Sequence, residues 1–287
     1  MRLSRILPAS PGNGACPFCL IGAGARLLLL DWKDGVVDRR RTEDWDFGVQ
    51  VADWAAFAAL RAALLDSARF TDCPVVHRLV HQSGVPIDFV PFGDLEAPPG
   101  SVTFAADERT MQVAGFAEAL EQAVPLAVAP DLTLPVVNLP GFVLLKLFSA
   151  NDRRENQQTK DLQDIRAVFA ACHAQDDNRD RTFDELADFW EAEAIDWDTA
   201  GAALMGHDVA AMIRPETYAR LVPILDWFCD AESRSLEPLM RLRVVGDERD
   251  ELSRRAGLYA LFAAFRLVLA ARYAQRETQA PGPVVQK

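Results

Sequence analysis

Three aspartates in two segments of the sequence have the side chains and spacing of ligands for divalent metal ions. Asp44 and Asp46 alternate in RTEDWDFGVQV at 41–51, and Asp88 lies in PIDFVPFG at 86–93. Alternate residues of an extended chain share a face, which places the first two carboxylates roughly 6 to 7 Å apart on one side of a strand. Because such like charges repel, either a cation bridges them or water screens them at an exposed acidic strand edge.

Asp88 strengthens the metal interpretation because it lies between Ile87 and Phe89 in a predicted inner strand, where a carboxylate needs a partner. If this strand adjoins the strand of Asp44 in one sheet, three hard oxygen ligands converge. Such a trio suits two Mg²⁺ ions in phosphoryl transfer. One ion would lower the pKa of an attacking hydroxyl, and the other would neutralise the departing pyrophosphate.

Two glycines that precede these acids form a candidate phosphate-binding turn. Gly22 and Gly24 form a predicted turn into an apolar helix that ends near Trp32. Glycines at such a turn allow backbone N–H groups to approach a triphosphate, with the N-terminus of the helix behind them.

The elements that position these residues are predicted from hydrophobic periodicity and turn signals. Asp53 is the expected N-cap of one helix, and Pro140 fits the first turn of another. We expect strands over 41–51 and 132–138, two strands within 75–91 joined at Gln82 to Gly84, short extended pieces in 101–113, and helices near 25–32, 54–65, 116–123 and 140–148.

From about residue 151 the strand signals fade and helical periodicity takes over. The predicted helices lie near 161–172, 183–194, 199–213, 215–229, 231–243 and 249–275. The expected organisation is therefore an α/β domain at 1–150, a helical domain at 151–275 and a disordered tail at 276–287, which has the Pro, Gly and Gln content of a disordered end.

Composition and charge argue against some classes of function, such as membrane proteins and proteins that coat nucleic acid. The chain has 287 residues, half of them hydrophobic, so it can bury a substantial core. Its formal net charge of -12 argues against broad coating of nucleic acid or of an anionic membrane. Pro8 and Pro11 cut the first apolar stretch, and Arg26 interrupts the run at 20–30, which is too short to span a bilayer. We therefore expect a cytoplasmic protein with no membrane partner.

Cys16 and Cys19 form a CPFC pair, which makes redox chemistry an alternative. A thioredoxin-like pair follows a strand and opens a helix, whereas this pair follows the loop-like PASPGNGA and precedes an apolar stretch. The sequence has no second CxxC to complete a zinc site, so ordinary semi-buried thiols are favoured.

The order of apolar stretch, glycine turn, helix, D-x-D strand and a third Asp on a later strand resembles the nucleotidyltransferases of the polymerase beta superfamily. Five segments look like the abortive-infection toxin type (AbiEii-like): IGAGAR at 21–26, RRTEDWDFGVQV at 40–51, PIDFVPFG at 86–93, LPGFVLLKLFSANDR at 139–153 and KDLQDI at 160–165. The resemblance covers roughly residues 15 to 170. It implies an α+β fold, in which a nucleotidyltransferase-like mixed sheet flanked by helices is followed by an all-helical C-terminal region.

The resemblance also implies a role for each matched residue. The implied catalytic residues are Asp44, Asp46, Asp88, Lys146, Lys160 and Asp161, of which the first three would also bind the metals. The implied nucleotide-binding residues are Gly22, Ala23, Gly24 and Arg26. Asp88 would activate the acceptor hydroxyl. Lys146 and Lys160 would neutralise phosphate charge, a role that suits a mobile point charge.

The implied activity is the Mg²⁺-dependent transfer of a nucleoside monophosphate from an NTP to an acceptor hydroxyl. The toxin type implies an RNA 3′ end as the acceptor and an antitoxin protein as a partner. The acidic net charge weakens the RNA interpretation, which leaves a protein hydroxyl or a small molecule as other acceptors.

Two alternatives remain open. In the first, the protein is a catalytically silent nucleotidyltransferase-fold binding or regulatory module. This alternative is favoured by Ala23, where the superfamily usually has Gly or Ser, and by Leu27, where an acid is expected. In the second, it is a D-x-D glycosyltransferase, which fits less well because only about forty residues precede Asp44.

Overall fold

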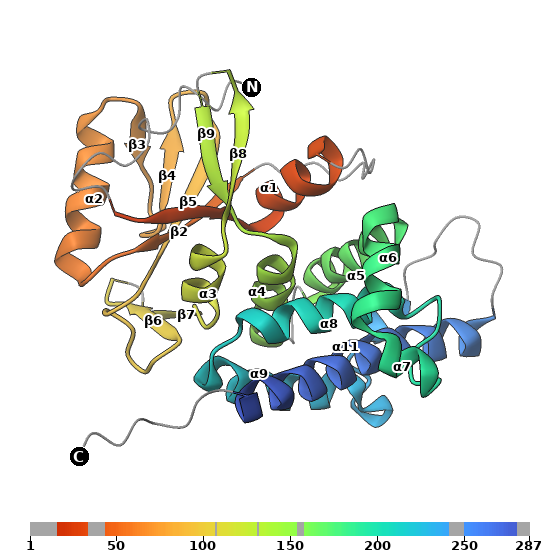
Figure 1. Ribbon diagram of the computed structural model, residues 1–287. Coiled ribbons are helices and arrows are strands. Elements are labelled where there is room, and N and C mark those ends of the chain that lie inside the picture. Colours follow the sequence, from red (N-terminus) through yellow and green to blue (C-terminus); the bar gives the residue numbers. More distant parts are fainter. Residues whose placement is uncertain are drawn as a thin grey trace, which may run out of the picture. The chain divides into compact units, whose positions relative to one another are not determined.

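A mixed β-sheet of seven strands lies in the N-terminal unit of the protein (Figure 1). The computed structural model describes residues 16–33, 44–106, 108–130, 132–153, 158–240 and 250–279, and the chain divides into two units, Met1–Asp152 and Arg153–Lys287. The strands of the sheet are β1 (Phe18–Ile21), β2 (Trp45–Gln50), β3 (Phe70–Asp72), β4 (Arg78–His81), β5 (Pro86–Phe92), β8 (Val124–Ala129) and β9 (Leu132–Val136). Their spatial order is β3-β4-β5-β2-β1-β9-β8, and β2 runs parallel to β5. A separate antiparallel pair is formed by β6 (Ser101–Phe104) and β7 (Arg109–Gln112).

Both faces of the central strand β2 are covered. The helices of this unit are α1 (Gly22–Arg26), the π-helix η2 (Leu27–Lys33), α2 (Trp54–Asp66), α3 (Phe116–Glu121) and α4 (Leu139–Asp152). On one face, Phe47 of β2 stacks on Phe89 of β5 with ring centroids 6.0 Å apart, and Phe57 of α2 lies on the same side. On the other face, Gly48 lies against the ring of Phe116 from α3. The strand therefore alternates its side chains between two packed layers.

The strands β2, β4, β5 and β9 and the capped helix α2 follow the sequence prediction. Asp53 caps α2, because its Oδ1 accepts a hydrogen bond of 2.7 Å from the backbone N–H of Ala56. The predicted pair of strands within 75–91 is β4 and β5. Three strands of the sheet were not predicted: β1, which was described only as an apolar stretch before the glycine turn, and the two edge strands β3 and β8. Edge strands are short or contain proline, as β8 does at Pro125, so they have little periodic apolar pattern.

The described part of the second unit consists of helices. They are α5 (Gln158–Ala174), α6 (Asp176–Glu185), α7 (Ala187–Glu191), α8 (Ala200–Met212), α9 (Pro215–Cys229), the 3₁₀ helix η3 (Ala231–Ser233), α10 (Glu237–Met240) and α11 (Glu251–Gln279). Two glycines of α8 allow close packing, since a Cβ at Gly201 would collide with the carbonyl of Phe169 in α5, and one at Gly206 with that of Phe265 in α11. The predicted fold class, an α+β mixed sheet flanked by helices and followed by a helical region, is confirmed for the described residues.

Three predicted boundaries in this unit differ from the structure. The helix predicted at 183–194 is two helices, α6 and α7, which meet at Leu186, and the helix predicted at 231–243 contains η3 and α10. α11 continues to Gln279, into the predicted tail, because Arg276 donates hydrogen bonds to the carbonyl oxygens of Ala210 and Ile213. The rest of the predicted tail, 280–287, lies outside the described residues, as does 241–249.

α11 is also long and apolar enough, by length and composition, to cross a membrane. Its apolar side includes Phe262, Phe265 and Leu269, which are buried, and the helix packs against α8 and α9. This side of α11 therefore contributes to the core of the helical unit.

Candidate active site

Asp46 and Asp88 lie side by side in the middle of the sheet. Their Cα atoms are register partners on the parallel strands β2 and β5, and neighbouring strands are about 4.8 Å apart. Register partners project to the same face of a sheet, so the two carboxylates lie next to each other on one face. β2 is hydrogen-bonded to β1 on its other side, so the interpretation of these acids as an exposed acidic strand edge is wrong.

Gly22 brings the backbone at the end of β1 against the carboxylate of Asp46. The preceding residue, Ile21, is the register partner of Asp46 across β1 and β2. Gly22 has a φ of +67°, a left-handed conformation that favours glycine, and a Cβ at this position would collide with the Asp46 carboxylate. Both the backbone conformation and the close approach therefore require a glycine here.

The other predicted nucleotide-binding residues follow in α1 and have different surroundings. Ala23 is half-buried in the first turn, and Gly24 lies against Trp45, since a Cβ on Gly24 would stand 2.6 Å from the Cε3 atom of that indole. Arg26 is only 3% exposed. Gly24 thus has a packing role, and Gly22 is the glycine of this turn that touches an acid.

Arg78 connects Asp88 with Asp44. Its Nε donates to Asp88 Oδ1 at 2.6 Å, and its Nη2 donates to Asp88 Oδ2 at 2.8 Å and lies 3.5 Å from Asp44 Oδ2. The hydrogen bonds to Asp88 raise the pKa of the Arg78 guanidinium above its usual range, and the charge of Asp44 adds to this effect. One guanidinium therefore gathers two of the three predicted metal ligands.

Sequence reasoning missed Arg78, although a signal for it was present. A turn was predicted at Gln82 to Gly84, and in a hairpin centred there residue 78 faces residue 88. The structure shows this register between β4 and β5. The buried His77 precedes Arg78, and its Nε2 lies 3.8 Å from Asp88 Oδ2.

The three remaining predicted residues lie on helices. Lys146 of α4 extends over the ring of Phe142, with Nζ 5.6 Å from the ring centroid. Lys160 and Asp161 belong to the second unit, in the first turn of α5, where Lys160 is exposed and Asp161 is fully buried. Arg153 Nη1 lies 3.5 Å from Asp161 Oδ2. Within the N-terminal unit, the structure gathers Asp44, Asp46 and Asp88.

The gathered side chains fit a hard divalent cation. They offer only carboxylate oxygens, which is the donor set that Mg²⁺ prefers. Asp44 is the more open of the two acids that Arg78 touches, with 44% of its side chain exposed against 11% for Asp88. Arg78 offsets part of the charge of Asp88 and Asp44, and a divalent cation bound by the three carboxylates would offset more of their repulsion.

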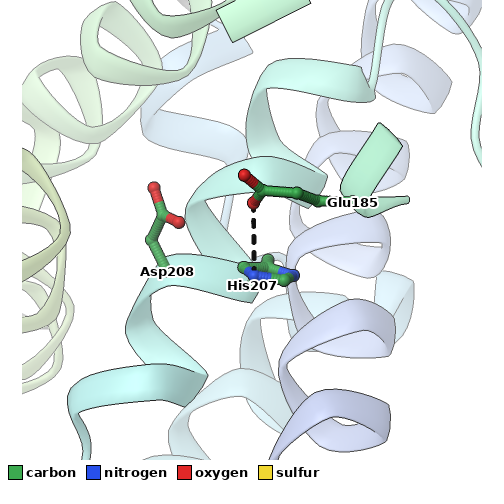
Figure 2. Close-up of side chains that lie close together, drawn as sticks. All are labelled: Glu185, His207 and Asp208. Carbon is green, nitrogen blue, oxygen red and sulfur yellow. Dashed lines mark ion pairs between the residues drawn. The ribbon is translucent and has the colours of Figure 1, made fainter. Parts of the chain in front are cut away.

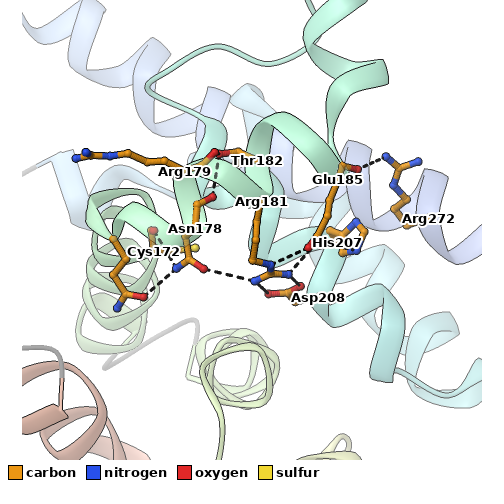
Figure 3. A network of polar contacts seen from close by, with 10 residues as sticks. Cys172, Asn178, Arg179, Arg181, Thr182, Glu185, His207, Asp208 and Arg272 are labelled. Atoms are coloured by element: carbon orange, nitrogen blue, oxygen red, sulfur yellow. Dashed lines mark hydrogen bonds and ion pairs between the residues drawn. The ribbon is translucent and has the colours of Figure 1, made fainter.

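A second group of metal-ligating side-chain types lies in the helical unit. Glu185 of α6 and His207 and Asp208 of α8 have ligand atoms within 4.8 Å of one another (Figure 2). Arg181 lies between the carboxylates: it donates to Glu185 at 2.8 and 2.9 Å and to Asp208 at 2.6 Å (Figure 3). This guanidinium provides the positive charge of the cluster, which is thus an ion-pair network that joins α6 to α8.

The redox alternative is disfavoured by the position of Cys19. This residue lies inside β1 and is 1% exposed, and burial raises the pKa of its thiol to about 12. A thiol with such a pKa remains protonated at neutral pH and is a poor nucleophile.

Comparison with known proteins finds limited similarity. No protein-family model matches the sequence, and neither does any curated protein. Among solved structures, the chain is similar to an antigenic nucleotidyltransferase-like protein from Paracoccidioides brasiliensis, with 18% sequence identity and a TM-score of 0.34. The match covers 52% of this chain and 65% of the other chain, which is less than two thirds of it. It is also similar to the Thermotoga maritima CCA-adding enzyme complexed with tRNA, with 11% identity and a TM-score of 0.20 over 91% of this chain and 78% of that one. Because both TM-scores are low, the functional proposal depends on the side chains of the site.

Proposed function

We propose that the protein is a metal-dependent nucleotidyltransferase that moves a nucleoside monophosphate from an NTP to an acceptor hydroxyl. The observation that carries the proposal is the register of Asp46 and Asp88, which places two carboxylates on one face of the sheet. Asp44 is linked to the same place through Arg78. A sheet that brings three acids together needs a cation to offset their repulsion, and phosphoryl transfer uses such a cation.

In this reaction the acceptor oxygen forms a bond to the α-phosphorus, the bond to the bridging oxygen breaks, and pyrophosphate leaves. Mg²⁺, when bound, supplies positive charge to the phosphates and lowers the pKa of the acceptor hydroxyl. Asp44, Asp46 and Asp88 would hold the metal, and Asp88 would also take the proton of the acceptor hydroxyl. Gly22 has no side chain, which lets the backbone of the proposed phosphate-binding turn lie directly against the carboxylate of Asp46.

Helix residues complete the proposal. Lys146 neutralises phosphate charge from α4, and for Lys160 and Asp161, which lie in α5 of the second unit, the catalytic role remains what the motif resemblance implies. Ala23 and Arg26 are further candidates for the nucleotide site, in the helix that follows Gly22. Substitution of each lysine by Met is expected to weaken NTP binding more than metal binding.

The proposal also includes the acceptor, the biological role and the cellular location of the protein. The motif resemblance favours an RNA 3′ end as the acceptor and a toxin restrained by an antitoxin protein. The interrupted apolar stretches near the N-terminus favour the cytoplasm, without a membrane partner. The net charge of -12 requires that RNA be recognised at a local site and not over the whole surface.

The proposal is tested by incubating the purified protein with each labelled NTP, Mg²⁺ and total RNA. We expect label to enter an acceptor with the wild type, and Asp46→Asn to reduce the rate by about 100-fold or more because a metal ligand is lost. Asp94→Asn removes an exposed charge from the same unit and is the matched control. Equal labelling by wild type and Asp46→Asn would contradict the assignment.

The silent binding module remains the second candidate, because Arg78 already provides a cation for Asp88. A silent module has no need of a metal-dependent NTP site. If no acceptor is labelled and NTP with Mg²⁺ does not shift the melting temperature, the silent module is favoured.

A further inference from the structure

We propose that Arg78 is a built-in counter-ion of the acidic site, which holds Asp88 and Asp44 in the metal-free protein and must release Asp88 when a divalent metal binds there. This inference deepens the proposed function and rests on it. It assigns a role to a residue outside the predicted metal-ligand set, and it makes metal affinity a property that Arg78 lowers.

The geometry of the pair supports this role. Arg78 uses two different nitrogens for the two oxygens of Asp88, at 2.6 and 2.8 Å, in the bidentate arrangement that makes arginine–carboxylate pairs strong. The two residues are register partners on β4 and β5, so the backbone keeps them opposite each other. The Asp88 side chain is only 11% exposed and that of Arg78 is 32% exposed, so water screens the pair less than it would screen a pair on the open surface.

The same geometry makes Arg78 a competitor of the metal. Both oxygens of Asp88 accept hydrogen bonds from the guanidinium, which occupies lone pairs that a metal ion would use. A divalent cation placed on Asp88 would also lie close to a fixed positive charge and be repelled by it. Loss of the guanidinium should therefore strengthen metal binding.

In the metal-free protein, Arg78 stabilises the fold. Its Nη2 lies 3.5 Å from Asp44 Oδ2, so one side chain offsets the charge of two acids. If Arg78 is removed, the guanidinium that offsets the charges of Asp88 and Asp44 is lost, and the repulsion among Asp44, Asp46 and Asp88 increases. The metal-free variant should consequently melt at a lower temperature than the wild type and gain more from added metal.

The experiment is a Mn²⁺ titration of the full-length protein by calorimetry, together with thermal melts with and without Mn²⁺. We expect Arg78→Met to bind Mn²⁺ about tenfold more tightly than the wild type, or better. Arg78→Lys should lie between them, because a point charge cannot pair with both oxygens at once. Arg61→Met is the matched control: it removes another arginine of the same unit, which pairs with Asp72, and it should leave the affinity unchanged.

Equal Mn²⁺ binding by Arg78→Met would overturn the inference because it would mean that Arg78 does not compete with the metal. Weaker binding would also overturn it, because it would mean that Arg78 positions Asp88 for the metal. If Arg78→Met fails to fold, Arg78→Lys decides in the same way. The two proposals fail differently. Mn²⁺ binding that is lost in Asp46→Asn but unchanged in both Arg78 variants contradicts only the role of Arg78. No Mn²⁺ binding by the wild type or by any variant contradicts the metal-dependent function as well.

Discussion

The carboxylate of Asp46 lies against Gly22, in the space that a Cβ on that glycine would need. The two residues come from different elements, since Gly22 opens α1 and Asp46 lies in β2, and the pairing of Ile21 with Asp46 holds them together. The close approach connects the glycine turn directly to the acidic site.

Gly22→Ala should therefore affect both stability and metal binding. The control is Gly84→Ala, because Gly84 also has a positive φ, +81°, but nothing lies within 4 Å of a Cβ there. We expect Gly84→Ala to cost about 1–2 kcal/mol from its backbone conformation. Gly22→Ala should cost at least about 1 kcal/mol more and weaken Mn²⁺ binding, because Asp46 must move. Urea unfolding and calorimetry measure the two effects, and equal costs with equal metal affinity would contradict the contact.

The Arg181 network should contribute to the stability of the helical unit. Arg181→Met leaves Glu185 and Asp208 without their shared cation, and we expect a loss of about 1 to 2 kcal/mol, limited by the partial exposure of these side chains. Arg266→Met breaks a more exposed pair with Asp226 in the same unit and should cost about 0.5 kcal/mol or less. Urea unfolding compares the two variants, and the result contradicts the role of Arg181 if the order is reversed.

The same network predicts how stability depends on pH. The hydrogen bond from Arg181 lowers the pKa of Glu185 below its usual value of 4.5. The unfolded state then binds more protons than the folded state in acid, so this contribution is present above the unfolded-state pKa and is lost as the pH falls through the folded-state pKa. Between about pH 5 and 3, the wild type should lose more stability than Arg181→Met. Parallel stability profiles of the two proteins would show that Glu185 is not involved.

Cys19 should resist alkylation in the folded protein. Burial raises the pKa of its thiol to about 12, so the thiol stays protonated at pH 8, and the side chain is only 1% exposed. Iodoacetamide labelling followed by mass spectrometry should modify Cys16, which is partly exposed, before Cys19. In urea the difference should disappear. Rapid labelling of Cys19 in the folded protein would reopen the redox interpretation of the CPFC pair.

Local features of the sequence determined much of what surrounds the site. Alternation in an extended chain places Asp46 and Gly48 opposite Phe47 and Val49, whatever the partners of the strand are. The N-cap at Asp53 follows from side-chain chemistry within four residues. The Arg78–Asp88 pair also lies within the reach of sequence reasoning, because a short hairpin sets its own register.

Only the tertiary structure decided which strands became neighbours. β2 and β5 are parallel and are separated in the chain by α2, β3 and β4, so no local rule sets the register that places Asp46 beside Asp88. The edge strands β3 and β8 are defined by the strands they join, since their own sequences have little alternation. Periodicity and capping depend on interactions over a few residues, whereas strand order and register depend on the packing of the whole sheet.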